Sequence, residues 1–189
     1  PFVPYKAFEG WKKIRRMYWP GGGKLAKDDI ESTGEPILPL TSWTWADAAP
    51  HGMLDAEQVN DQRFDRDQYR QAFADNWNEQ DVDIVIGPGF VGPASAHDTA
   101  FYWTYTSLWN LVDYPGVVVP TPIRAGKKGE EGYAGDYTPL SEECKRVKEL
   151  WDEADFEGAP INLQICARRY HDNELFGALK VLKDALELP

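Results

Sequence analysis

Three short apolar segments constrain the fold of this chain more than any other feature. They lie at residues 83–86, 116–119 and 161–167, and proline or glycine bounds each of them. Short apolar runs with such boundaries are typical of buried strands. Because helical segments separate them, we predict an α/β fold with a largely parallel or mixed sheet flanked by helices. Three strands barely fill a sheet, so we expect further strands from a preceding segment.

The segments between the strands carry apolar residues every three or four positions, which is the periodicity of helices. The predicted helices span residues 8–19, 55–78, 99–112, 141–152 and 172–186. The main stripes that these helices should bury are Tyr69, Phe73 and Trp77; Phe101, Tyr105, Leu108 and Val112; and Leu175, Leu179, Leu182 and Leu186. Residues 31–53 are expected to form a long surface excursion, and residues 121–140 a mobile loop.

Composition excludes several classes of function. The 31 acidic and 20 basic residues give a net charge of −11, which disfavours a nucleic-acid partner and an anionic membrane surface. No apolar run approaches the roughly 20 residues that span a bilayer, so we expect no membrane-spanning segment. The two cysteines are too few for a disulfide scaffold. They favour a reducing compartment, so we predict a cytoplasmic protein.

No catalytic or metal-binding motif emerges from the residues themselves. The stretch from Pro20 to Lys24 lacks the spacing and the hydroxyl residue of a phosphate-binding loop. Ser95, His97 and Asp98 are neighbours along the chain, whereas a nucleophile, a base and an orienting acid usually converge from separate elements. The three histidines have no metal-ligand spacing. We therefore nominate no catalytic residue and expect neither a metal nor a cofactor.

Three longer stretches resemble the amidase signature hydrolases. Residues 156–170, FEGAPINLQICARRY, are similar to the family's closing segment "EGAPVGLQLVGRRY". Residues 105–120, YTSLWNLVDYPGVVVP, resemble "YTSLWNLLDYPAVVFPV", and residues 81–88, DVDIVIGP, resemble "DVDVILCP". The opening PFVPYKAFEGW and the segment at 34–40 are similar to fungal acetamidase-like members. The resemblance covers essentially the whole chain, with the motifs in the family's order.

This resemblance implies a hydrolase that cleaves small carboxamides with a Ser–Ser–Lys triad. The family's lysine and its Gly/Ser-rich stretch lie upstream of the matching motifs, and residues 1–189 contain no such stretch. Residues 1–189 are thus expected to be the C-terminal part of a single amidase domain, whose upstream part is its partner. The alternative is a truncated or degenerate member that serves as a non-catalytic interaction module, with apolar surface covered by a partner or by a second copy in a homodimer.

The resemblance also implies which residues line the substrate pocket. In the fatty-acid amide hydrolase branch, the helix before the "DYPA"-like turn lines the acyl channel, and its positions correspond here to Ala100, Trp103 and Ser107. Spacings of three and four would place these residues on one helical face. The bulk of Trp103 favours a short or flat acyl or aryl group. The alternative is that both faces of this helix pack in the core.

Phe90 and His97 are weaker pocket candidates, because the Gly/Pro-rich loop at 87–97 is expected to reach the rim of the site. The chain departs from the family pattern at three places: Asn162 replaces a glycine, Cys166 and Ala167 replace "VG", and Gly116 replaces an alanine. A glycine often marks a close approach of backbone, so Asn162 predicts a local repacking.

Overall fold

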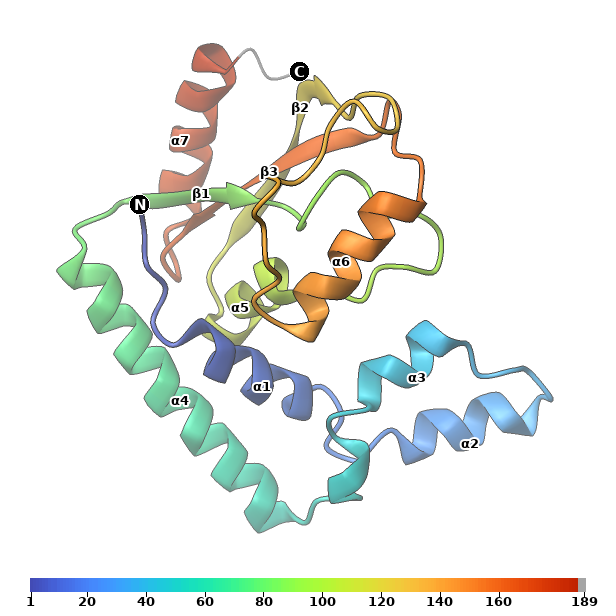
Figure 1. Ribbon diagram of the computed structural model, residues 1–189. Coiled ribbons are helices and arrows are strands. Elements are labelled where there is room, and N and C mark those ends of the chain that lie inside the picture. The colour runs from blue at the N-terminus through green and yellow to red at the C-terminus, as the bar shows by residue number, and fades with distance from the viewer. Residues whose placement is uncertain (187–189) are drawn as a thin grey trace. The chain divides into compact units, whose positions relative to one another are not determined.

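A computed structural model describes residues 1–186 and divides the chain into two compact units (Figure 1). Unit 1 comprises residues 1–83 and 107–113, and unit 2 comprises residues 84–106 and 114–186. The elements, in chain order, are α1 (Ala7–Met17), α2 (Lys24–Ser32), α3 (Pro39–Trp45), the 3-10 turn η1 (Ala49–His51), α4 (Ala56–Glu79), β1 (Ile84–Pro88), α5 (Thr104–Val112), β2 (Gly116–Arg124), α6 (Glu142–Glu153), β3 (Pro160–Ala167) and α7 (Asp172–Ala185).

Unit 1 is built on the long helix α4. Asp55 caps it: its side chain accepts a hydrogen bond from the Gln58 amide, while the Gln58 side chain accepts one from the Asp55 amide. Tyr69, Phe73 and Trp77 follow at intervals of four residues and are all buried. This confirms both the helix and the buried stripe that the sequence predicted.

A buried arginine joins α1 to α3 within unit 1. The Arg15 guanidinium lies 3.9 Å from the ring centroid of Trp43 and 5.2 Å from that of Trp11. Its Nε donates to the Asp47 carboxylate at 2.5 Å, and its Nη2 donates to the Trp43 carbonyl. Such a charge is tolerated in an interior because ion pairing and aromatic faces replace its hydration.

Residues 31–53 lie mostly at the surface, as the sequence predicted, but much of the segment is helical. It contains the end of α2, all of α3 and η1. Pro39 occupies the first turn of α3, where its missing N–H costs no hydrogen bond, so proline here starts a helix. The sequence analysis missed these helices because it took the Pro-, Thr- and Ala-rich composition of the segment as a sign of a surface excursion.

The sheet of unit 2 has the strand order β1–β3–β2 (Figure 1). Both pairings are antiparallel, with Val85 opposite Cys166 in one and Val118 opposite Gln164 in the other. The α/β class is confirmed, but within residues 1–186 the sheet is antiparallel where the sequence favoured parallel or mixed pairing. β1 and β2 run in the same direction, and β3 lies between them in the opposite direction. The periodicity of the sequence does not reveal which strand lies between the other two.

Helix α7 covers one face of this sheet. Leu175 is buried against Ile165 and Ala167, and Leu179 and Leu182 pack at the edge of the same cluster. The predicted stripe is confirmed except at Leu186, which is 41% exposed just beyond the helix end. Ile86 on β1 is also 44% exposed, so β1 is not buried on both faces as predicted.

Helix α5 begins at Thr104, five residues after the start of the helix predicted over residues 99–112. Its buried residues are Ser107, Leu108, Leu111 and Val112, whereas Phe101 precedes the helix and Tyr105 is 42% exposed. The predicted core face is therefore correct only in its second half. No helix within residues 1–186 combines the length and the apolar character needed to cross a membrane.

Gly10 permits a close approach of α1 to α4 and offers a test of the fold. A Cβ at this position would lie 2.5 Å from the Tyr69 hydroxyl, which itself donates to the Tyr5 carbonyl at 2.6 Å. We expect Gly10→Ala to lower the free energy of unfolding by about 2 kcal/mol, measured by urea denaturation.

The control is Gly177→Ala in α7, where a Cβ meets nothing within 4 Å. The helix preference of alanine should make this variant more stable by about 0.5–1 kcal/mol. Equal effects of the two substitutions would contradict the packing described for Gly10.

Candidate functional site

The loop from Gly89 to Trp103 joins β1 to α5 and carries four of the five predicted pocket residues. The Gly89 amide donates to the Asn162 carbonyl at 3.1 Å, and the Ala94 amide donates to the Pro160 carbonyl at 3.2 Å. These bonds attach the first half of the loop to the beginning of β3. Phe90 is half-buried and His97 is exposed.

Ala100 and Trp103 lie in the irregular segment just before α5, so they do not share a helical face as the sequence predicted. They are connected in another way, because the Trp103 indole N–H donates to the Ala100 carbonyl at 2.8 Å. The Trp103 carbonyl in turn accepts from the Thr106 amide and from the Thr106 hydroxyl, both at 3.1 Å. Both residues are half-buried, and these bonds hold the indole in a defined orientation.

Ser107 belongs to unit 1 and is only 1% exposed. Within the part of the chain that the structure describes, its Oγ is a buried side-chain oxygen without a hydrogen-bond partner. A buried hydroxyl of this kind is costly unless something else bonds to it.

The sheet presents a polar network to the start of α5. Gln164, on β3, donates through its amide to the Tyr105 carbonyl at 3.1 Å and to the Cys166 sulfur at 3.3 Å. Burial raises the pKa of the Cys166 thiol to about 12, so this cysteine stays protonated and is a poor nucleophile at neutral pH. Its sulfur lies 3.1 Å from where a Cβ of Gly116 would be.

Helix α6 places Arg146 and Cys144 against the end of the same loop. The Arg146 guanidinium lies 3.8 Å from the ring centroid of Phe101. Burial, with the neighbouring Cys144 thiol as a smaller cause, raises the pKa of Tyr102 to about 12. Tyr102 therefore remains a neutral phenol and is not prepared to act as a general base near neutral pH.

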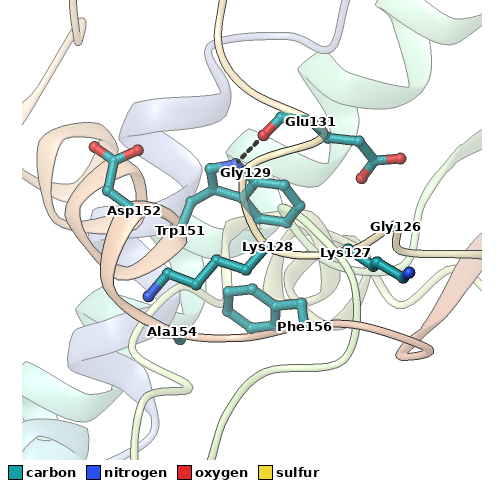
Figure 2. Close-up of a pocket in the computed structure, with 9 residues that line it drawn as sticks. All are labelled: Gly126, Lys127, Lys128, Gly129, Glu131, Trp151, Asp152, Ala154 and Phe156. Atoms are coloured by element: carbon teal, nitrogen blue, oxygen red, sulfur yellow. Dashed lines mark hydrogen bonds between the residues drawn. The ribbon is translucent and has the colours of Figure 1, made fainter.

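A separate cavity of about 160 Å³ lies at the C-terminal end of α6 (Figure 2). One wall consists of the rings of Trp151 and Phe156, which stack at 5.3 Å with an angle of 7° between their planes. The Trp151 indole N–H donates to the Glu131 carbonyl at 3.3 Å, the bond drawn in Figure 2. The other lining residues are Gly126, Lys127, Lys128, Gly129, Asp152 and Ala154.

Sequence reasoning missed this cavity because it treated residues 121–140 as a mobile loop. One signal was available: Trp151 and Phe156 are large aromatic residues at the end of an otherwise polar helix. In residues 1–186, no group of three or more histidine, cysteine, aspartate or glutamate side chains is placed to hold a metal ion.

Comparison with known proteins places this geometry in a family. The sequence model of the family described as Amidase matches residues 31–176, which is most of the chain. The chain belongs to the amidase family. A Schizosaccharomyces pombe protein named as an amidase is 36% identical over 171 residues, covering 89% of this chain and 31% of the relative. An acetamidase of Aspergillus oryzae is 27% identical over 175 residues, with the same coverage of both chains.

Among solved structures, a fatty acid amide hydrolase matches 98% of this chain with a TM-score of 0.89 and 27% identity. The match covers 33% of that hydrolase, so this chain spans about a third of the length of the relatives it resembles. The family resemblance drawn from the three sequence motifs is confirmed, as is the α/β fold.

Two departures from the amidase pattern are neighbours in the structure. Gly116 lies opposite Cys166 in the sheet, and the close approach of Cys166 sulfur leaves little room for the alanine that the family motif carries at position 116. The third departure, Asn162, packs its Cβ 3.4 Å from where a Cβ of Gly89 would be. Asn162 therefore lies beside the loop that carries the pocket candidates, and the local repacking there stays a prediction.

The burial of Cys166 is testable with a thiol reagent. In the folded protein we expect the half-buried Cys144 to react with Ellman's reagent and Cys166 to stay unmodified, since its thiol is 1% exposed and its pKa is raised. Both should react in 6 M guanidinium chloride. A Cys144→Ser variant isolates the second thiol. Rapid labelling of that variant under native conditions would contradict the packing of β3.

Proposed function

We propose that the protein to which this chain belongs hydrolyses the carbon–nitrogen bond of small carboxamides by the Ser–Ser–Lys mechanism. In that mechanism a serine hydroxyl attacks the amide carbonyl, and the amine leaves with a proton to give an acyl-enzyme. Water then attacks the ester and releases the carboxylic acid. The lysine relays protons between these groups. These catalytic residues would lie outside residues 1–189, in an upstream part of the same protein.

The observation that carries this proposal is the likeness to a fatty acid amide hydrolase over 98% of the chain at a TM-score of 0.89. The amidase and acetamidase names of the relatives agree with it. The raised pKa values of Cys166 and Tyr102 agree with catalytic residues that lie elsewhere in the protein, because both side chains stay neutral near pH 7 and neither is a reactive group there.

In this proposal the chain contributes scaffold and part of the substrate pocket. Ala100 and Trp103 would form part of the pocket wall. The hydrogen bond from the Trp103 indole to the Ala100 carbonyl would hold the flat indole ring in one orientation there. Phe90 and His97 would lie nearer the rim, on the part of the loop that is anchored to β3; of the two, His97 is exposed and Phe90 is half-buried. For Ser107, in the other unit, a place in the pocket stays a prediction from the resemblance.

The upstream part would also cover apolar surface on the sheet. Among the residues described, β1 and β2 each pair with β3 alone. Ile86 and Val118 on these strands are 44% and 53% exposed. An edge with exposed apolar side chains invites a further strand. A cytoplasmic location and a homodimer both stay predictions.

Trp103 provides the sharpest test of the pocket. In the intact protein, Trp103→Ala should shift preference toward bulkier acyl groups, changing the ratio of kcat/KM values for benzamide-type and acetamide-type substrates by about 10-fold or more. The matched control is Phe176→Ala, which removes an aromatic side chain that is 61% exposed on α7. It should leave the ratio unchanged.

Three outcomes separate the alternatives. Equal losses of kcat/KM for all substrates in Trp103→Ala would mark the indole as a structural residue and remove it from the pocket. Absence of any amide hydrolysis by the intact protein would overturn the enzymatic proposal and favour a non-catalytic interaction module. A changed ratio in Phe176→Ala as well would show that the assay reports general destabilisation.

A further inference from the structure

We propose that Gln164 is a positioning residue for the substrate pocket: its side-chain amide fixes the segment that carries Trp103 and thereby helps to set which acyl groups are accepted. This inference rests on the proposed function, because it concerns the same pocket. Gln164 acts through the segment from Ala100 to Tyr105 and not by touching the substrate itself. The segment and Gln164 both lie within unit 2.

The loop that carries the pocket candidates is attached to β3 in two different ways. At its beginning, the main-chain amides of Gly89 and Ala94 donate to carbonyls at the start of the strand. At its end, the Gln164 side chain donates to the Tyr105 carbonyl at 3.1 Å. The first attachment does not depend on the identity of any side chain, whereas the second depends on one. The position of the end of the loop is therefore sensitive to the residue at 164.

Burial and hydrogen-bonding capacity suit Gln164 to this role. The residue is 7% exposed, so water competes little for its amide group. The amide nitrogen carries two N–H donors, which serve the Tyr105 carbonyl at 3.1 Å and the Cys166 sulfur at 3.3 Å. A carbonyl oxygen can only accept a hydrogen bond, so the nitrogen of the amide must face Tyr105. A buried amide with both donors used holds one orientation.

Short connections lead from the Tyr105 carbonyl to the indole of Trp103. The Thr106 amide and hydroxyl both donate to the Trp103 carbonyl at 3.1 Å, which ties Trp103 to the first turn of α5. The Trp103 indole N–H in turn donates to the Ala100 carbonyl at 2.8 Å. Because Trp103 lies two residues before the carbonyl that Gln164 holds, a shift of that carbonyl would move the indole as well.

Helix α6 also contacts this segment, but in a less restrictive way. The Arg146 guanidinium lies 3.8 Å from the ring centroid of Phe101. That contact joins two side chains, which can change rotamer together while the main chain moves. The bond from Gln164 holds the main chain directly, so the positioning role falls to Gln164 rather than to Arg146.

Gln164→Met in the intact protein tests the proposal, because methionine keeps an unbranched side chain of similar length and has no N–H donor. Release of the Tyr105 carbonyl should loosen the indole wall and favour bulkier acyl groups. We expect the ratio of kcat/KM for benzamide to that for acetamide to rise about 5-fold. The matched control is Ile165→Val, which loosens packing under α7 on the opposite face of the same strand and should change the ratio by less than about 2-fold.

A double-mutant cycle shows whether Gln164 acts through Trp103. In a Trp103→Ala background, Gln164→Met should change the ratio by less than about 2-fold, because the wall residue that it positions is gone. A general structural role would keep the whole effect in that background. Gln164→Glu repeats the measurement with a side chain of the same shape whose carboxylate cannot donate. It should change the ratio in the same direction.

Hydrogen exchange followed by mass spectrometry gives a readout that needs no substrate. In Gln164→Met, the amides of residues 99–106 should exchange about 10-fold faster than in the unsubstituted protein, whereas those of α7 should not change. Ile165→Val should leave the exchange of residues 99–106 unaltered. The comparison separates loosening of the loop end from loosening of the whole sheet.

Three results would overturn the proposal: an unchanged ratio in Gln164→Met and Gln164→Glu, a full effect in the Trp103→Ala background, or an equal change in Ile165→Val. In each case the unsubstituted protein would still hydrolyse amides, so the proposed function would stand. Absence of hydrolysis by the unsubstituted protein would overturn the proposed function and the specificity role with it. Faster exchange at residues 99–106 in Gln164→Met would then still support the attachment of the loop, so the two failures are distinguishable.

Discussion

The central strand β3 positions the other elements of unit 2. Among the strands of residues 1–186, β3 alone pairs on both sides, with β1 along one edge and β2 along the other. Alternate side chains serve the two faces: Ile165 and Ala167 pack under α7, whereas Gln164 and Cys166 point to the opposite side. The Gln164 side chain donates to the Tyr105 carbonyl, and this bond fixes the first turn of α5 to the sheet.

The same strand positions the loop that carries the proposed pocket wall. Backbone bonds from Gly89 and Ala94 end on carbonyls at the start of β3, and the Trp103 indole is fixed by the Ala100 carbonyl further along. The loop thus has anchored ends and a fixed aromatic residue. That arrangement suits a surface that must keep its shape against a substrate, since a displaced wall residue costs catalytic efficiency. The chemistry itself would come from groups elsewhere in the protein.

Long periodic features were predictable from the sequence, and choices between pairings were not. α4 and α7 were found because Tyr69, Phe73 and Trp77, and likewise Leu175 and Leu179, repeat at helical spacing over several turns. The antiparallel order of the strands was missed, because apolar runs of this length look alike in either direction.

The pocket candidates came from the family resemblance and not from the periodicity of the sequence. Their spacing of three and four residues wrongly predicted that Ala100, Trp103 and Ser107 share one face of a helix. α5 begins at Thr104, so Ala100 and Trp103 are linked by a side-chain hydrogen bond instead. The cavity beside Trp151 was missed because it depends on a loop held by two hydrogen bonds from side chains distant in sequence. Periodicity carries no information about such bonds.

Amide turnover by residues 1–189 purified alone, compared with turnover by the complete protein under the same conditions, tests the central claim most directly. If this chain supplies scaffold and pocket wall for reactive groups located elsewhere, the isolated chain should release no ammonia from acetamide or benzamide above the buffer background, while the complete protein releases it. Hydrolysis by the isolated chain, at a rate that scales with its concentration, would contradict the account.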